Sequence, residues 1–261
     1  MKLESHLRAR RAEGAKLLVP YVTGGLGAHW CDVVRAVVDG GADAVEIGIP
    51  FSDPVMDGRT IQEASQRALD LGATPVSVLA GLAHLDVPVP LVVMTYYNLI
   101  AHMGHARAAA ALADAGVDGA ILPDLPLDEI DRGDDSWGAA AEAHAVETVL
   151  LAAPNTTDER LRAICDRSRG FVYGVSLLGV TGEREALAAH AAGMGRRCKA
   201  VTDRPVLLGV GISSPGQAAE AAASADGVIV GSALVRRLLD GGGPEEARAF
   251  VASLRDALDR A

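Results

Sequence analysis

The chain has 261 residues, of which 49% are hydrophobic and only 3% aromatic, and its formal net charge is −10. This length is typical of a single α/β barrel, and the apolar content is enough for a large core. The negative charge argues against nucleic acid or an anionic membrane as a partner. No apolar run has the length of a membrane span, residues 1–13 lack the core of a signal peptide, and the cysteines show no paired spacing. We therefore expect one cytoplasmic domain over residues 1–261.

Hydrophobic patterning and glycine stops divide the chain into alternating strands and helices. A short amphipathic N-terminal helix carries Leu3 and Leu7, with Arg8, Arg10 and Arg11 on its polar side. Strands are predicted at residues 16–23, 44–49, 90–95, 119–122, 146–152, 171–175, 205–210 and 227–230. Helices are predicted at residues 28–39, 59–71, 74–85, 106–115, 131–145, 157–167 and 215–224, with one more before the seventh strand and one closing the chain. The acidic residues 131–135 are interpreted as a solvated helix entry.

A short repeated sequence pattern, called the sequence echo below, supports this division into strands and helices. Gly41-Ala-Asp43, Gly116-Val-Asp118 and Ser224-Ala-Asp226 each end a helix and lead into an apolar strand. A repeating unit of about 30 residues predicts a parallel sheet covered by helices. Eight units close into a barrel, whereas five or six form an open doubly wound sheet. Because the chain has eight predicted strands, we expect a (β/α)8 TIM barrel with an extra N-terminal helix, and chemistry on the loops that follow the strands.

The second predicted strand contains the strongest functional signal. Alternation places Ala44, Glu46 and Gly48 on one face, so a carboxylate lies between two small residues on an apolar strand. An unpaired buried carboxylate is costly or takes up a proton. Asp57 follows at the end of the loop that begins at Pro50. A salt bridge for Glu46 and a turn at Asp57 would explain both structurally, but two carboxylates after a strand favour catalysis.

Three later loops are rich in glycine and hydroxyl residues. They are Gly179-Val-Thr-Gly182, Gly209-Val-Gly-Ile-Ser-Ser214 and Gly231-Ser232. Glycines let backbone N–H groups approach an anion, and a helix beginning at Ser232 adds the positive end of its dipole. Since phosphate usually binds after the seventh and eighth strands of such barrels, we predict a phosphate site there.

The positions of the lysines and histidines exclude two further classes of reaction mechanism. The only lysines are Lys2, Lys16 and Lys199, and none follows a predicted strand, so a Schiff-base aldolase would lack its nucleophile. His102 and His105 have helical spacing, but no third ligand is nearby, so we expect neither a metal nor a cofactor. Because neither a metal nor an imine is expected, the remaining mechanism is proton transfer by the two carboxylates on a phosphorylated substrate.

Six segments follow one another in order over nearly the whole chain: Pro20-Tyr-Val-Thr-Gly, Val45-Glu-Ile-Gly-Ile-Pro-Phe-Ser-Asp-Pro-Val-Met-Asp-Gly58, Phe171-Val-Tyr, Gly179-Val-Thr-Gly182, Gly211-Ile-Ser-Ser214 and Val230-Gly-Ser-Ala233. Together they resemble the tryptophan synthase alpha chain family, and the segment from Glu46 to Asp57 is the most specific. The resemblance implies a lyase that cleaves indole-3-glycerol phosphate to indole and glyceraldehyde 3-phosphate by a retro-aldol step. It also implies a tryptophan synthase beta chain as partner in an α2β2 assembly.

The resemblance also implies roles for particular residues. Glu46 and Asp57 match the catalytic carboxylates, Tyr173 matches a tyrosine beside the substrate, and Gly182, Gly211, Gly231 and Ser232 match phosphate-binding positions. Apolar walls for the indole are expected from Tyr21, Ile61, Tyr96, Leu125 and Leu127, although plain barrel packing explains these equally well. Thr181 is expected to meet Asp57 when a lid formed by residues 50–57 and 174–185 closes. Trp30 and Trp137 are interpreted as helix packing and surface contacts.

Departures from the family pattern bear on substrate fit and lid closure rather than on the carboxylates. Arg59 replaces a frequent proline, Val210 a frequent phenylalanine, and Leu177-Leu178 a more polar pair. Three alternatives to the partnered lyase stay open. They are a stand-alone lyase that releases free indole, a non-catalytic subunit that only activates its partner, and, more distantly, a phosphosugar epimerase or isomerase.

Overall fold

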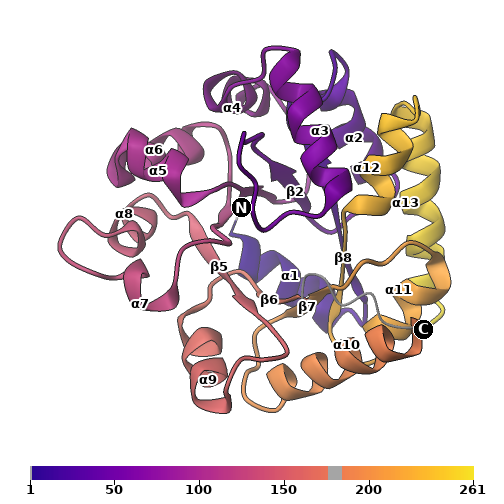
Figure 1. The fold of residues 1–261 in the computed structure, drawn as a ribbon. Helices are drawn as coiled ribbons and strands as arrows, with labels where there is room; N and C mark the ends of the chain where they lie inside the picture. The colour runs from indigo at the N-terminus through magenta and orange to yellow at the C-terminus, as the bar shows by residue number, and fades with distance from the viewer. Residues whose placement is uncertain (1, 176–183) are drawn as a thin grey trace.

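The computed structural model describes residues 2–175 and 184–261. Eight parallel strands form a closed barrel in which each strand pairs with the next and β8 pairs with β1. The strands are β1 Leu17–Thr23, β2 Val45–Gly48, β3 Leu91–Met94, β4 Gly119–Ile121, β5 Glu147–Ala152, β6 Val172–Val175, β7 Val206–Gly209 and β8 Gly227–Val230. The predicted (β/α)8 barrel with an N-terminal helix is confirmed, and the helices surround the strands in Figure 1.

The helices of the described residues alternate with these strands. They are α1 Leu3–Ala12, α2 Trp30–Asp39, α3 Arg59–Asp70, α4 Pro75–Ala83, α5 Tyr97–Met103, α6 His105–Asp114, α7 Leu127–Ile130, α8 Trp137–Ala143, α9 Asp158–Arg167, α10 Arg184–Lys199, α11 Pro215–Ala222, α12 Ser232–Leu239 and α13 Pro244–Leu258. Thr74 caps α4, and Ser77 completes a capping box with it. None of the helices in the described part is long and apolar enough to span a membrane.

Several helical predictions were wrong in detail. Helices α5 and α7 were missed, α8 begins later than expected, and two helices rather than one close the chain. Gly104 (φ +83°) separates α5 from α6, and Gly241 (φ +99°) follows α12; both adopt the left-handed conformation that only glycine enters easily. The interpretation of residues 131–135 as solvated was incomplete, because Asp131 forms an ion pair with Arg167 of α9.

Helix α1 closes one end of the barrel. Leu3 and Leu7 are fully buried and belong to the same cluster as Phe171 at the start of β6. In Figure 1 this indigo helix lies in the middle of the ring of strands. The polar side forms ion pairs, among them those of Arg8 and Arg11 with Asp203. The functional site must therefore open at the other end, where the strands reach their C-termini.

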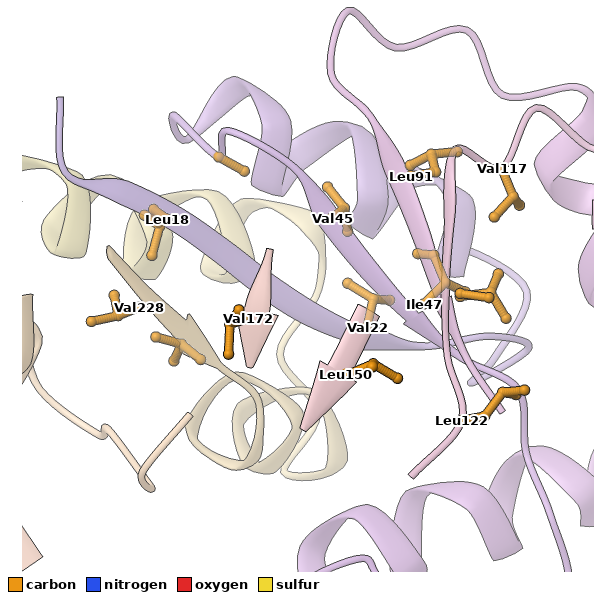
Figure 2. Close-up of a cluster of buried hydrophobic side chains, with 14 of the residues drawn as sticks. Leu18, Val22, Val45, Ile47, Leu91, Val117, Leu122, Leu150, Val172 and Val228 are labelled. Carbon is orange, nitrogen blue, oxygen red and sulfur yellow. The ribbon is translucent and has the colours of Figure 1, made fainter. Parts of the chain in front are cut away.

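Side chains of the strands pack in two layers. Inward-facing residues of the barrel form one cluster, which includes Val19, Val92 and Leu207. Outward-facing residues pack against the surrounding helices, and Figure 2 shows this cluster with Leu18 and Val45 labelled. The period of two along each strand assigns successive residues to opposite layers.

The three aspartates of the sequence echo all bind the backbone of a neighbouring strand. The Asp43 carboxylate accepts a hydrogen bond from the Leu18 N–H at 2.9 Å. Asp118 accepts one from the first residue of β3 at 3.3 Å, and Asp226 one from the first residue of β7 at 2.8 Å. Each aspartate precedes one strand and bonds the start of the strand before it. These bonds tie adjacent αβ units together at the end of the barrel that α1 covers.

Candidate active site

Glu46 lies inside the barrel and is 1% exposed. Strand alternation points it inward, and its Oε2 atom has no hydrogen-bond partner among the residues that the structure describes. Burial, together with the nearby Asp57 charge, raises the pKa of Glu46 to about 8. The salt bridge that would have made Glu46 structural is not present in the described part of the chain. The carboxyl group is therefore protonated at neutral pH and free to exchange its proton with a ligand.

Asp57 faces the same cavity from the loop between β2 and α3. Burial raises the pKa of Asp57 to about 6, and a hydrogen bond with the Tyr96 side chain opposes that rise. Two carboxyl groups of one cavity thus differ in protonation at neutral pH, with Asp57 largely ionised and Glu46 largely neutral. This separation assigns a proton donor and an anion to the same site.

The two carboxyl groups line a cavity of about 200 Å³. Six of the other predicted residues also line it: Tyr21, Ile61, Tyr173, Gly211, Gly231 and Ser232. Three more wall residues lie in segments that the sequence marked, Gly209 in the glycine-rich loop and Met56 and Val175 in the predicted lid. The sequence reasoning missed Met94, Pro123, Leu151 and Ile229. Met94, Leu151 and Ile229 lie at inward positions near the C-terminal ends of their strands, so the alternation that identified Glu46 also marks these three. Most of the wall is apolar, as a flat aromatic substrate requires.

Two tyrosines fill space that two glycines leave open. A Cβ atom on Gly48 would lie 1.8 Å from the Tyr21 hydroxyl oxygen, and one on Gly209 would lie 2.4 Å from the Tyr173 ring. Both glycines therefore allow a tyrosine ring to approach the backbone of a neighbouring strand closely. Burial first, and then the two carboxylates, hold the pKa of both tyrosines well above the ordinary value. Their hydroxyl groups are consequently neutral and able to donate hydrogen bonds.

Glycines and one serine form the opposite wall of the cavity. Ser232 is the first residue of α12, and Gly231 precedes it directly. Gly211 has a φ of +76°, which favours glycine. No lysine lines the cavity in the described residues, and Lys16 donates instead to Ala222 and Ala225 carbonyls. The glycines and the serine predicted to bind phosphate thus line the cavity where α12 begins. Thr181 and Gly182 lie outside the described residues.

Some predicted contacts lie elsewhere in the structure. Leu125 and Leu127 line a second pocket between the β4–α7 and β5–α9 loops, beyond the wall formed by Pro123 and Leu151. Tyr96 is buried behind Asp57 and does not line the cavity.

The tryptophan at the start of α8 corrects one further prediction. Of the expected helix packing and surface contacts, the structure confirms only helix packing for Trp137, because this residue is 1% exposed and donates a hydrogen bond to Thr148. Its indole therefore anchors α8 on the inner side, against β5. Among the described residues, no group of three or more His, Cys, Asp or Glu side chains could hold a metal ion.

Comparisons with known proteins agree with this geometry. A family model described as the tryptophan synthase alpha chain matches residues 7–257. The tryptophan synthase alpha chain of Streptomyces coelicolor is 44% identical over 265 residues, which cover 97% of this chain and 94% of that protein. A chain of Mycobacterium tuberculosis tryptophan synthase superposes with a TM-score of 0.89 at 39% identity, covering 98% of this chain and 97% of that one. The Legionella pneumophila alpha subunit gives 0.89 at 31% identity over the full length of both chains. This chain therefore belongs to the tryptophan synthase alpha chain family.

Proposed function

We propose that this chain cleaves indole-3-glycerol phosphate to indole and glyceraldehyde 3-phosphate, and that Glu46 and Asp57 carry the reaction. One observation supports these roles most strongly. A neutral buried carboxyl group with a pKa of about 8 and a carboxylate with a pKa of about 6 share one largely apolar cavity. Cleavage of the bond between indole C3 and the glycerol chain needs an acid at C3, a base at the side-chain hydroxyl and an anion near the ring nitrogen.

The protonation states give an order to the proton transfers. Protonated Glu46 first donates its proton to C3, which places a positive charge on the indole ring nitrogen. The Asp57 carboxylate accepts the hydrogen bond of the ring N–H and stabilises this charge. Glu46, now ionised, takes the proton of the side-chain hydroxyl as the carbon–carbon bond breaks. The electrons of that bond return to the ring, so indole and the aldehyde leave, and Glu46 regains its proton.

The wall formed by Gly211, Gly231 and Ser232 is the proposed phosphate seat. Backbone N–H groups, the Ser232 hydroxyl and the N-terminus of α12 supply the donors without a lysine. A substrate analogue without phosphate should therefore bind much more weakly than the phosphorylated compound. Equal binding of the two would contradict this seat.

We further propose that the chain works in the cytoplasm as the alpha subunit of a tryptophan synthase with a beta chain. Val55 and Met56, in the loop that carries Asp57, are 74% and 41% exposed. Large apolar side chains exposed beside a cavity favour a protein partner on this face. A partner that binds the closed form of the loop best would raise turnover more than substrate affinity. A stand-alone lyase would instead be fully active alone.

Steady-state cleavage of indole-3-glycerol phosphate tests the proposal, with the purified chain alone and with a tryptophan synthase beta chain. We expect slow cleavage alone and strong activation by the partner. Replacement of Glu46 by Gln should lower turnover about a hundredfold or more, because general acid–base catalysis contributes on that scale. Near-native turnover of this variant would remove Glu46 from the mechanism. High activity alone, without response to the partner, would favour the stand-alone lyase.

A further inference from the structure

Tyr96 connects three parts of the loop between β2 and α3. Its hydroxyl oxygen accepts a hydrogen bond from the Met56 backbone N–H at 2.9 Å. Asp57 is the next residue along the chain, and a side-chain hydrogen bond with Tyr96 lowers its pKa. The ring stacks on Phe51 at the start of the loop, with the two centroids 5.0 Å apart and an interplanar angle of 26°. Tyr96 itself is 3% exposed and follows β3, so it belongs to the rigid barrel.

The contact with Met56 uses only the acceptor capacity of the Tyr96 hydroxyl. Because the oxygen accepts from the Met56 N–H, its own proton is available for the Asp57 carboxylate. The loop is otherwise open to solvent, since Met56 and the preceding Val55 are exposed. Gln62 of α3 also donates hydrogen bonds to the Asp57 and Pro54 carbonyls, but both of these bonds are exposed. Tyr96 is the buried side chain that holds this loop, so it determines where the Asp57 carboxylate lies.

We propose that Tyr96 is a positioning residue, whose hydroxyl joins the backbone of the β2–α3 loop to the Asp57 carboxylate and so fixes this carboxylate in the cavity. The inference deepens the proposed function and rests on it, because the value of an oriented Asp57 lies in the charge that develops on the indole nitrogen. Tyr96 does not line the cavity, so it acts through Asp57 and not on the substrate.

The groups around Asp57 determine what removal of the hydroxyl does. Glu46 of β2, Tyr21 of β1 and Tyr173 of β6 all interact electrostatically with Asp57, and none of them is a cation. Asp124, after β4, is the other charged group that acts on Tyr96. The hydrogen bond of Tyr96 is the interaction that lowers the pKa of Asp57 against the effect of burial. Without this bond, the pKa of Asp57 rises and the ionised form is lost at a higher pH.

The chain provides a matched pair of variants for the test. Tyr96→Phe removes the hydroxyl but keeps the ring on Phe51. Tyr97→Phe removes the hydroxyl of the next residue, which contacts His105 Nε2 at 2.9 Å and does not line the cavity. Both changes delete one oxygen atom at neighbouring positions, so a general effect on folding is controlled.

The first measurement is the pH dependence of kcat/KM, with the beta chain present. In Tyr96→Phe the acid limb should move upward by about one pH unit, the size expected for a lost hydrogen bond to a charged group. The alkaline limb, set by Glu46, should stay, so activity is lost mainly on the acid side and recovers as the pH rises. A merely structural effect would lower kcat/KM equally at every pH, and that result would overturn the inference.

The second measurement needs no substrate. Hydrogen exchange of the Met56 amide should be about fivefold faster in Tyr96→Phe, because a hydrogen bond of about 1 kcal/mol is lost, and unchanged in Tyr97→Phe. An unchanged amide in Tyr96→Phe, or equal effects of the two variants, would refute the positioning role. If the wild-type chain cleaves no indole-3-glycerol phosphate with its partner, the proposed function fails, and the exchange result alone decides whether Tyr96 holds the loop.

Discussion

Replacement of Glu46 by Gln should raise the free energy of unfolding of this protein, although the same change lowers its turnover. A buried carboxyl group whose folded-state pKa is raised binds its proton more tightly in the native state than in the unfolded chain. Between the two pKa values the native state therefore holds one more proton, and stability falls as the pH rises. The Gln amide keeps the shape of the protonated side chain but has no proton to lose in this range.

The pKa of Glu46 fixes the size of the effect. With an unfolded value of 4.5 and a folded value of about 8, stability falls by about 1.4 kcal/mol per pH unit across this interval. The cost is about 3 kcal/mol at pH 7 and about 5 kcal/mol above pH 8. Near pH 4.5 both side chains are neutral in the folded state, so the variant and the wild type should be similarly stable.

Urea unfolding at a series of pH values between 4.5 and 8.5 measures this difference. The free energy of unfolding of Glu46→Gln minus that of the wild type should rise steadily with pH and level off near pH 8. Glu220→Gln, an exposed position on α11, is the matched control and should show no such trend. A difference for Glu46→Gln that stays constant with pH would refute the reasoning, because it would mean that Glu46 is ionised at little cost in the folded protein.

Two further predictions concern positions that hold the barrel together. Gly48→Ala should lower kcat/KM on the order of a hundredfold, because the new Cβ atom would lie 1.8 Å from the Tyr21 hydroxyl oxygen and displace the ring from the cavity wall. Gly216→Ala is the control: its new Cβ atom would have no heavy atom within 4 Å, so kcat/KM should not change. Asp43→Ala should lower the free energy of unfolding by about 1–3 kcal/mol, since it leaves the buried Leu18 N–H without an acceptor and removes one of two ion-pair partners from Arg10 and from Arg255. Asp203→Ala, at a side chain that is 84% exposed, should leave the urea midpoint unchanged.

The sequence was sufficient for the barrel because its signals are local and repeated. Apolar runs bounded by turn residues located all eight strands, and each predicted boundary lies within one residue of the observed one. Helix α7, Leu127–Ile130, was missed because one helical turn is too short to show a hydrophobic period. Helix α5, Tyr97–Met103, was missed for a similar reason, because it has only seven residues and ends at Gly104.

The candidate site was predictable only where a strand determines the direction of a side chain. Alternation pointed Glu46 inward, and the structure agrees. Beyond the strand ends no such period operates, so Leu125 and Leu127 were expected in the cavity but line another pocket. The depth of an inward residue depends on the stagger between strands, which is not encoded in any one strand. For this reason Met94 and Leu151 were not recognised as walls of the cavity.

Buried carboxyl groups have different surroundings at the two ends of this barrel. Asp43 and Asp226 are buried at the start of their strands, and each has basic partners as well as a backbone N–H. Glu46 is buried further along its strand and has neither in the described part of the chain. The same fold thus gives partners to the carboxylates that join adjacent units and gives none, in the described residues, to the carboxyl group proposed to exchange a proton. A cation beside Glu46 would hold it ionised at neutral pH, and the proton for indole C3 would then be missing.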